Sequence, residues 1–402
     1  MTGTARRGVA MRMDGRGAVP QPARTAPTLS RRRLLQAGVL GGALLAIDAC
    51  APRTGSTRYG LLGPPDANGL QLPPGFSSRV VARSGELVAA TGYQWHPAPD
   101  GGYCFAAPGG WVYVSNSELD RVGGVGMVRF DQAGTVVAAA RLLDRTNRNC
   151  AGGHTPWDTW LSCEEVSNGR VYEVNPLGAT PPVAHVGMGR FQHEGAAVDA
   201  ARQVVYLTED EHDGLLYRYR YDRPSDLTTG VLEAARVDGD LVSWLPVPDP
   251  SARKQPTRSQ VVGATAFRGG EGIWFSNDVV NLATKYDDKV WAYNVVTQRL
   301  SVIYDWTVSP TPYIRGVDNI AVRHGDVFVC EDQGTIGNPE DPEICVIEPN
   351  GVVSILVRAV GHRLSEMTGP AFSPAGDRLY FSSQRGTSGQ GITFEVSGPF
   401  PA

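Results

Sequence analysis

The hydrophobic positions of this chain fall into short runs and not into the spacing of three and four residues that is typical of amphipathic helices. From about residue 76 onward, runs rich in Val, Ile and aromatic residues end at Gly, Asp or Asn. Such runs are typical of strands that are joined by turns. The pattern predicts an all-β fold over residues 76–402, with almost no helix.

A hydrophobic run that closes on an acid or an amide recurs six times along the chain. The runs end at Glu118, Glu164, Glu209, Asn277 with Asp278, Glu331 and Gln384. Repeats of about 40–50 residues that each hold several strands are typical of propeller blades. The longest interval precedes residue 277, and we assign it to a proline-rich insertion around residues 232–258, which is not expected to form a regular strand. The sequence therefore predicts a six-bladed β-propeller.

The acids that close these runs have a predicted position in such a fold. The innermost strand of each blade runs along the central channel, and loops from all blades meet at one mouth of it. For any single acid, capping of its own turn is the alternative interpretation. Carboxylates that are brought together, however, repel one another unless cations lie between them. The repeat therefore predicts a metal site at one mouth of the channel.

Residues 149–165 have the composition of a metal site. Cys150 lies in a turn of small residues, and a short apolar run then leads to the adjacent carboxylates Glu164 and Glu165. A small residue at a turn lets backbone approach whatever the sulfur binds. The alternative is that Cys150 is a small buried core residue.

Three further segments hold candidate ligands. Glu194 follows His193 just ahead of a predicted strand, Glu271 lies in a glycine turn, and Asp318 precedes Asn319 after a basic residue. Of the His193–Glu194 pair we prefer Glu194, because hard cations favour oxygen. An Asp-Asn pair also forms turns, which is the alternative for residues 318–319.

Composition excludes several classes of function. Charged residues make up 19% of the 402 residues, the net charge is −4, and no basic run occurs after the first 33 residues, so a nucleic-acid partner is not expected. The chain has no Gly-x-Ser-x-Gly elbow, His-Glu-x-x-His motif, Walker loop or EF-hand loop. The glycines at 123–126 have no following helix, which excludes a dinucleotide fingerprint.

The first 50 residues are predicted to be an export signal and not part of the fold. A basic leader precedes Ser30-Arg31-Arg32-Arg33-Leu34-Leu35, which follows the twin-arginine pattern, and the apolar core at 34–47 is shorter than the about 20 residues of a membrane span. A general secretory signal is the alternative. We expect export across a bacterial inner membrane by the twin-arginine machinery, followed by a flexible tether at 51–75 and a single propeller domain at 76–402.

Two questions about cysteines stay open at this stage. Cys50 follows a small residue at the end of the apolar core, where bacterial lipoproteins are lipidated, but Asp48 stands where a small residue is usual. Five cysteines follow the signal, an odd number that leaves at least one unpaired. A Cys150 that binds a metal would be that one.

The chain resembles the PhoX-type phosphatases, bacterial enzymes with a propeller fold that are exported by the twin-arginine route. The resemblance rests on the Asn-Cys-x-Gly-Gly-x-Thr-Pro-Trp run at 149–157 with the following 163–165, and on residues 189–194, 317–319 and 111–118. It spans roughly residues 85–398 and is greatest to the short members of the family.

The resemblance implies a phosphatase that hydrolyses phosphate monoesters through an iron and calcium cluster and a metal-bound water or oxide. It implies these metal ligands: Cys150 to iron, Glu194, Glu271 and Asp318 to iron and calcium, and Glu209 and Glu331 to calcium. Glu118 is a further candidate metal ligand, from the repeat of acids at the channel mouth. Asn116 would face the phosphate. An arginine would clamp it, and the candidates are Arg190, Arg268, Arg315 and Arg385. The chain departs from the family at Arg268-Gly269-Gly270-Glu271, which is one residue longer than the family's Arg-Pro-Glu, and at Ser117, where a His is usual.

Two other classes of protein stay open. A calcium-dependent propeller hydrolase of the lactonase kind would use the same acids but gives Cys150 no role. A non-catalytic propeller would use them only to fix its loops and would act as an exported binding module. In the preferred interpretation the partner is a small phosphorylated substrate, and we expect a monomer.

Overall fold

The computed structural model describes residues 58–309, 314–333 and 340–401. The predicted export signal and residues 51–57 lie outside this range. The described residues form strands β1 to β26 and three 3₁₀ helices, η1 (Val186–Met188), η2 (Thr257–Gln260) and η3 (Lys285–Asp287). None of the helices in this range is long and apolar enough to cross a membrane. The prediction of an all-β fold is confirmed.

The strands form antiparallel sheets that follow the chain order. The first two sheets contain β3 (Pro99–Ala107), β4 (Gly110–Ser117), β5 (Gly123–Asp131) and β6 (Val136–Thr146), then β7 (Asn149–His154), β8 (Trp160–Glu164), β9 (Val171–Val174) and β10 (Val183–Ala184). The last two end the chain: β20 (Val317–Arg323), β21 (Asp326–Glu331), β22 (Glu343–Ile347) and β23 (Val353–Ala359), then β24 (Met367–Phe372), β25 (Arg378–Ser383) and β26 (Ile392–Ser397).

Between them lies a nine-stranded sheet. One half holds β11 (His193–Asp199), β12 (Val204–Glu209), β13 (Leu216–Arg223), β14 (Asp226–Asp238) and β15 (Leu241–Pro246). The other holds β16 (Gly270–Ser276), β17 (Val279–Thr284), β18 (Lys289–Asn294) and β19 (Arg299–Asp305). The halves are joined through one residue pair, Leu241 with Arg299. The insertion predicted around residues 232–258 therefore contains strand residues, because β14 and β15 extend into it.

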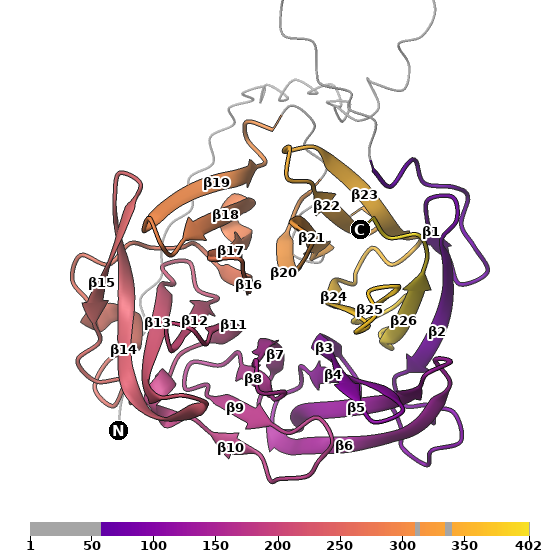
Figure 1. The fold of residues 1–402 in the computed structure, drawn as a ribbon, viewed down its shortest axis with the longest axis horizontal. Helices are drawn as coiled ribbons and strands as arrows, with labels where there is room; N and C mark the ends of the chain where they lie inside the picture. The colour runs from indigo at the N-terminus through magenta and orange to yellow at the C-terminus, as the bar shows by residue number, and fades with distance from the viewer. Residues whose placement is uncertain (1–57, 310–313, 334–339, 402) are drawn as a thin grey trace, which may run out of the picture. The chain divides into compact units, whose positions relative to one another are not determined.

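The strands β3, β7, β11, β16, β20 and β24 surround a central channel, and each contacts the next around it (Figure 1). Glycine makes this close approach possible. A Cβ atom on Gly153 of β7 would lie 1.7 Å from the carbonyl oxygen of Ala196 on β11, and one on Gly101 of β3 would lie 2.5 Å from Cα of Ala151. The arrangement is propeller-like, as predicted.

The segment predicted as a tether is in part a packed element, which corrects the domain boundary at residue 76. Strand β1 (Leu70–Gln71) pairs with β23, and β2 (Ser77–Arg83) pairs with the C-terminal strand β26. Tyr59 is buried and its hydroxyl donates to Asp326 at 2.8 Å. Residues 58–75 belong to the folded unit, since they supply a strand and a buried ring that later sheets would otherwise lack.

One predicted run has a different place in its sheet. Five of the predicted runs correspond to second strands. Glu164, Glu209 and Glu331 are the last residues of β8, β12 and β21, and Glu118 and Gln384 directly follow β4 and β25. The run at 272–278, in contrast, belongs to the innermost strand β16, and the second strand is β17. Asn277 and Asp278 therefore form the turn after β16, where Asp278 pairs with Arg202 and is half exposed. They do not join the other acids.

Candidate metal centre

The second residue of each innermost strand forms the first of two tiers of polar groups. These residues are Asp100, Cys150, Glu194, Glu271, Asp318 and Thr368 in β3, β7, β11, β16, β20 and β24. All six are buried. The strands start at the same end of the channel, so their second residues meet there. We call them the inner tier.

The residue that follows each second strand forms an outer tier. These residues are Glu118, Glu165, Asp210, Lys285, Asp332 and Gln384. The register of the sheets explains the placement, since the first residue of every innermost strand pairs with the last residue of its second strand, as Asn149 does with Glu164 and Gly270 with Thr284. The residue after each second strand therefore lies next to the start of the innermost strand, beside the inner tier.

Four overlapping triads connect the two tiers. In each triad the potential ligand atoms all lie within 4.8 Å of one another. The triads are Cys150 with Glu165 and Glu194, Glu194 with Glu271 and Asp318, Asp318 with Asp332 and Glu366, and Asp100 with Glu118 and Glu366. We call these nine residues the acid ring. Glu194, Asp318 and Glu366 each belong to two triads, which is the arrangement of carboxylates that bridge neighbouring cations.

Two half-exposed arginines lie at the rim of the acid ring. Arg148 donates to Glu118 at 2.6 Å and to Glu165 at 2.8 Å. Arg385 donates to Glu366 at 2.6 Å, and its guanidinium lies 3.9 Å from Glu118. Both side chains keep more than two-fifths of their surface exposed.

Lys285 is a third basic residue at the ring and is nearly buried. Its Nζ lies 2.8 Å from Glu271, 3.4 Å from Asp318 and 3.4 Å from Asp332. Within the described residues, the ion pairs of the ring thus bring three basic side chains to eight carboxyl groups and one thiol. The ring as a whole has an excess of acids.

Burial shifts the acids of the ring toward their neutral form. Burial, with the nearby carboxylates Glu118 and Asp318, raises the pKa of Asp100 to about 8. Burial also raises the pKa of Glu165 to about 8 in spite of Arg148, and it raises the pKa of Glu194 well above its usual range. A carboxylate that is desolvated and crowded by like charges stays ionised only with a cation beside it. The electrostatics are those of a cation site.

The thiol of Cys150 meets the same conditions. Burial, followed by the charges of Asp100 and Glu194, raises the pKa of Cys150 well above its usual value. Its Sγ lies 3.7 Å from Oδ2 of Asp100. Oε1 of Glu194, in the same triad, is buried with no hydrogen-bond partner in the described part of the chain. A bound metal would ionise the thiol and satisfy this oxygen. The donor set fits a metal that accepts sulfur next to others that accept only oxygen.

Two acids that were expected in the metal site lie outside the acid ring. Glu209 accepts a hydrogen bond from Tyr217 at 2.8 Å and pairs with Arg258 at 3.1 Å. Glu331 accepts the backbone N–H of Arg315 and lies in a separate group with Glu343 and Cys345. Successive residues of a strand project to opposite faces. The residue after each of them therefore projects to the opposite face: Asp210 lies in the outer tier, and Asp332 lies in the outer tier and in a triad of the ring.

Asn116 also has a different environment from the one expected. Its Nδ2 donates to the carbonyl oxygens of Cys150 at 2.9 Å and Ala151 at 2.7 Å. Its Oδ1 accepts from Trp160 and from Ser162, each at 2.9 Å. The amide is fully hydrogen-bonded and completely buried, so it does not face a phosphate. It holds the strand of Cys150 in place.

The three arginines first proposed as a phosphate clamp have other surroundings. Arg190 donates to the carbonyl oxygen of Asn168, and Arg268 is exposed. Arg315 donates to Asp288 at 2.8 Å and lies over the ring of Trp306. The fourth candidate, Arg385, does lie at the acid ring. So does Arg148, which sequence reasoning missed although it stands two residues before Cys150.

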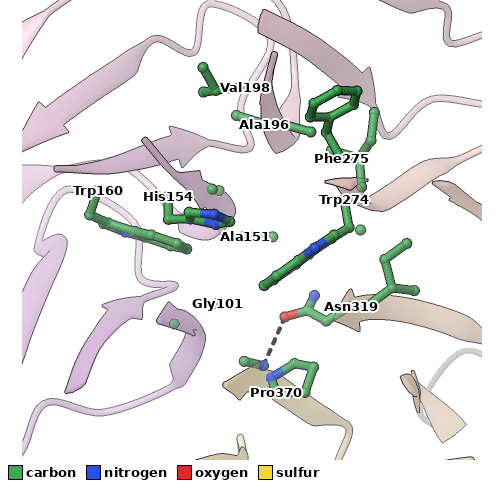
Figure 2. Close-up of a pocket in the computed structure, with 18 residues that line it drawn as sticks. Gly101, Ala151, His154, Trp160, Ala196, Val198, Trp274, Phe275, Asn319 and Pro370 are labelled. Atoms are coloured by element: carbon green, nitrogen blue, oxygen red, sulfur yellow. Dashed lines mark hydrogen bonds between the residues drawn. The ribbon is translucent and has the colours of Figure 1, made fainter. Parts of the chain in front are cut away.

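Beyond the inner tier, the innermost strands continue into small and apolar residues that line a pocket (Figure 2). The ring of His154 stacks on that of Tyr103, with centroids 4.1 Å apart, and lies 5.1 Å from Trp274. Oδ1 of Asn319 accepts the backbone N–H of Gly369 at 2.9 Å. Among the described residues that line this pocket there is no carboxylate or thiol.

Sequence reasoning missed Asp100, Lys285, Asp332 and Glu366 as members of the site, whereas Glu165 was named together with Cys150. Asp100 precedes two glycines, as Cys150 nearly does, and this acid-then-glycine pattern at a strand start was a usable signal. Lys285 has no such signal. The run at 272–278 was assigned to a second strand, but it belongs to the innermost strand β16, and Lys285 follows the true second strand β17.

Comparison with known proteins finds one matching family model and several solved structures with a similar fold. The family described as alkaline phosphatase PhoX matches residues 139–306, a segment that contains Cys150, Glu165, Glu194, Glu271 and Lys285. This match confirms the predicted resemblance to the PhoX-type phosphatases. No curated protein sequence matches the chain significantly.

Solved structures agree with the fold. The structure of Pseudomonas fluorescens PhoX in complex with vanadate, a transition state analogue, aligns with a TM-score of 0.69 and 16% identity over 82% of this chain and 96% of that chain. A gluconolactonase from Xanthomonas campestris aligns with a TM-score of 0.51 and 12% identity over 85% of this chain and 99% of that chain. At these identities the likeness concerns the fold alone.

Proposed function

We propose that this chain, which matches the alkaline phosphatase PhoX family at residues 139–306, is a metal-dependent phosphatase that hydrolyses phosphate monoesters at the acid ring. The observation that carries the proposal is the convergence of eight carboxyl groups and the Cys150 thiol at one end of the channel. Such a group of acids is fully ionised only with cations beside it, and cations also neutralise the negative charge of a phosphoryl group.

The donor types assign the metals. Cys150, with Glu165 and Glu194, would hold iron, because a soft thiolate ligand suits iron and not calcium. The carboxylate oxygens of the other triads suit calcium. When bound, these ions would neutralise the phosphoryl oxygens and supply Lewis acidity for the displacement.

The residues at the rim would bind and orient the substrate. Arg148 and Arg385 both contact Glu118 from half-exposed positions, so their guanidinium groups flank one point of the rim. A planar guanidinium fits two phosphoryl oxygens at once. The two arginines would orient the phosphoryl group against the ring and leave the alkoxide group toward solvent.

The test is a comparison of wild type with Cys150→Ala after native export. We expect wild type to retain iron and calcium and to hydrolyse p-nitrophenyl phosphate. The variant should lose iron and at least about 100-fold in kcat/KM, since it lacks a direct ligand. Iron retained by the variant at the wild-type ratio would contradict the iron assignment, and a metal-loaded wild type without phosphatase activity would contradict the proposed function.

A lactonase-like hydrolase is the alternative that the fold also allows. The oxygen triads alone would serve it, but the Cys150 triad would have no role, and the sequence match to the phosphatase family would be unexplained. Hydrolysis of gluconolactone without hydrolysis of phosphate esters would favour this alternative.

The proposal includes an architecture and a location. We count the nine-stranded sheet as two blades, because its halves share one residue pair, which gives six blades around the channel. We also propose twin-arginine export as a monomer, with lipidation of Cys50 to be tested by mass spectrometry of the mature protein. Metal loading before export would follow, since twin-arginine substrates cross the membrane folded.

A further inference from the structure

Lys285 breaks the pattern of the outer tier. Four of the six positions in this tier carry acids, and the sixth carries the neutral amide of Gln384. The register of β16 with β17 places Lys285 at the position that Glu118, Glu165 and Asp332 occupy in their sheets. Lys285 therefore places a positive charge at a position where four of the other five outer-tier residues are acids that could bind a cation.

The contacts of Lys285 are those of a cation in a carboxylate site. Its ammonium group lies 2.8 Å from Oε1 of Glu271, 3.4 Å from Oδ2 of Asp318 and 3.4 Å from Oδ2 of Asp332, and only 12% of the side chain is exposed. These three carboxylates come from two neighbouring sheets. A lysine ammonium is a compact point charge with three donors, which matches three acceptors.

The ammonium group of Lys285 lies between two triads, and this position affects how many cations the acid ring can bind. Glu271 and Asp318 belong to the triad with Glu194, while Asp318 and Asp332 belong to the triad with Glu366. The ammonium thus takes up oxygens of both triads. Carboxylates that are engaged by Lys285 have fewer free acceptor positions for calcium, which needs six to eight oxygens.

We propose that the Lys285 ammonium takes the place of one divalent cation in the acid ring. This inference rests on the metal-dependent function proposed above. It assigns the metal ions of this chain to the regions on either side of Lys285: the Cys150 triad on one side and the Asp100–Glu118–Glu366 triad on the other. An otherwise identical ring with an acid or amide at position 285 would bind one more divalent cation.

The experiment measures metal content per chain by elemental analysis after dialysis against micromolar calcium. Lys285→Glu restores the acid of the other sheets, and Lys285→Gln places there the amide that the chain itself has at Gln384. We expect each variant to bind one additional calcium ion per chain. Lys285→Arg keeps the charge and should retain the wild-type count.

The matched control is Lys289→Glu, which makes the same change of charge on the neighbouring strand. Lys289 pairs with Asp287 and Asp305 at 3.5 Å and does not contact the acid ring in the described structure. This variant should keep the wild-type metal count. A thermal melt provides a second readout, since added calcium should raise the midpoint of Lys285→Gln more than that of wild type or Lys289→Glu.

Three results would overturn the inference. Folded Lys285→Glu and Lys285→Gln proteins with the wild-type metal count would show that Lys285 displaces no cation. An unchanged count together with loss of inhibition by inorganic phosphate would assign Lys285 to the phosphate instead. A wild-type protein that retains no divalent metal would remove the proposed function as well, which separates the two failures.

Discussion

At the scale of single residues, the end of each second strand presents two successive polar groups with opposite roles. Glu165 lies in the triad with Cys150 and accepts from Arg148. Glu164, directly before it, accepts hydrogen bonds from the backbone N–H groups of Asn147 and Arg170 and so stabilises the turns next to these two residues. Successive side chains of a strand point to opposite faces. A candidate metal ligand and a structural carboxylate can therefore be separated by a single peptide bond.

This alternation makes a sharp prediction for the pair. Glu165→Gln should lower the metal content and reduce kcat/KM by about 10- to 100-fold, because it weakens one ligand of the Cys150 triad. Glu164→Gln should keep the metal content and cost roughly 1 kcal/mol of stability through two weaker hydrogen bonds. Elemental analysis, kinetics and urea unfolding of both variants check this. Equal loss of metal from the two variants would contradict the assignment of the tiers.

The alternation also explains which site residues could be predicted from sequence. Cys150, Glu194, Glu271 and Asp318 were named because each stands among glycines or in the family's motifs, and all four lie in the acid ring. Glu118, Glu209 and Glu331 were named from the ends of hydrophobic runs: Glu118 lies in the acid ring, whereas Glu209 and Glu331 each lie one residue before the outer tier. The hydrophobic pattern gives the end of a strand, but the face that a given residue takes depends on register, which one sequence does not specify.

At the scale of elements, four innermost strands, β3, β7, β11 and β16, combine a residue of the acid ring with a glycine that follows it within two positions. The glycine lets neighbouring strands pack backbone to backbone, and this packing brings the inner tier within ligand distance. Gly153 is the tightest example, since a Cβ there would lie 1.7 Å from the carbonyl oxygen of Ala196. The geometry of the acid ring thus depends on residues that carry no chemistry of their own.

Gly153→Ala should therefore destabilise the fold by about 3 kcal/mol, because the strands β7 and β11 would have to separate. Gly63→Ala is the control, since a Cβ there meets only Leu72 O at 3.4 Å, and its cost should stay under about 1 kcal/mol. Urea unfolding of the metal-free proteins measures both. A Gly153→Ala protein as stable as the control would show that the strands separate at little cost.

Element order was largely readable from the sequence, and its errors have one physical source. The runs at 204–209 and 326–331 were recognised as strands, and they are β12 and β21. The run at 272–278 looks the same in sequence but is an innermost strand. An innermost and a second strand are both largely buried, so their compositions are similar. Because of that error, Lys285 was not recognised as a residue of the outer tier. The packing of residues 58–75 could not be read either, since short polar segments gain their order from partners far along the chain.

At the scale of the whole propeller unit, the acid ring makes stability depend on metal and pH together. In the metal-free protein, burial raises the pKa of Asp100 and of Glu165 to about 8, whereas both groups titrate near pH 4 when unfolded. The folded state therefore holds protons that the unfolded state releases. The stability that these groups contribute is full below about pH 4 and is lost as the pH rises toward 8.

The metal-loaded protein should behave in the opposite way. Ligation requires the ionised carboxylates and thiol, so rising pH favours binding, and binding to the folded state adds stability. We expect the thermal midpoint of the chelator-treated protein to fall steadily from pH 5 to pH 9, while that of the protein with calcium and iron stays level or rises. Scanning calorimetry at pH 5, 7 and 9 with and without metal measures the difference between the two curves. Parallel curves would mean that the eight carboxyl groups of the ring are held by protein contacts alone, and the ring would then have no need of cations at alkaline pH.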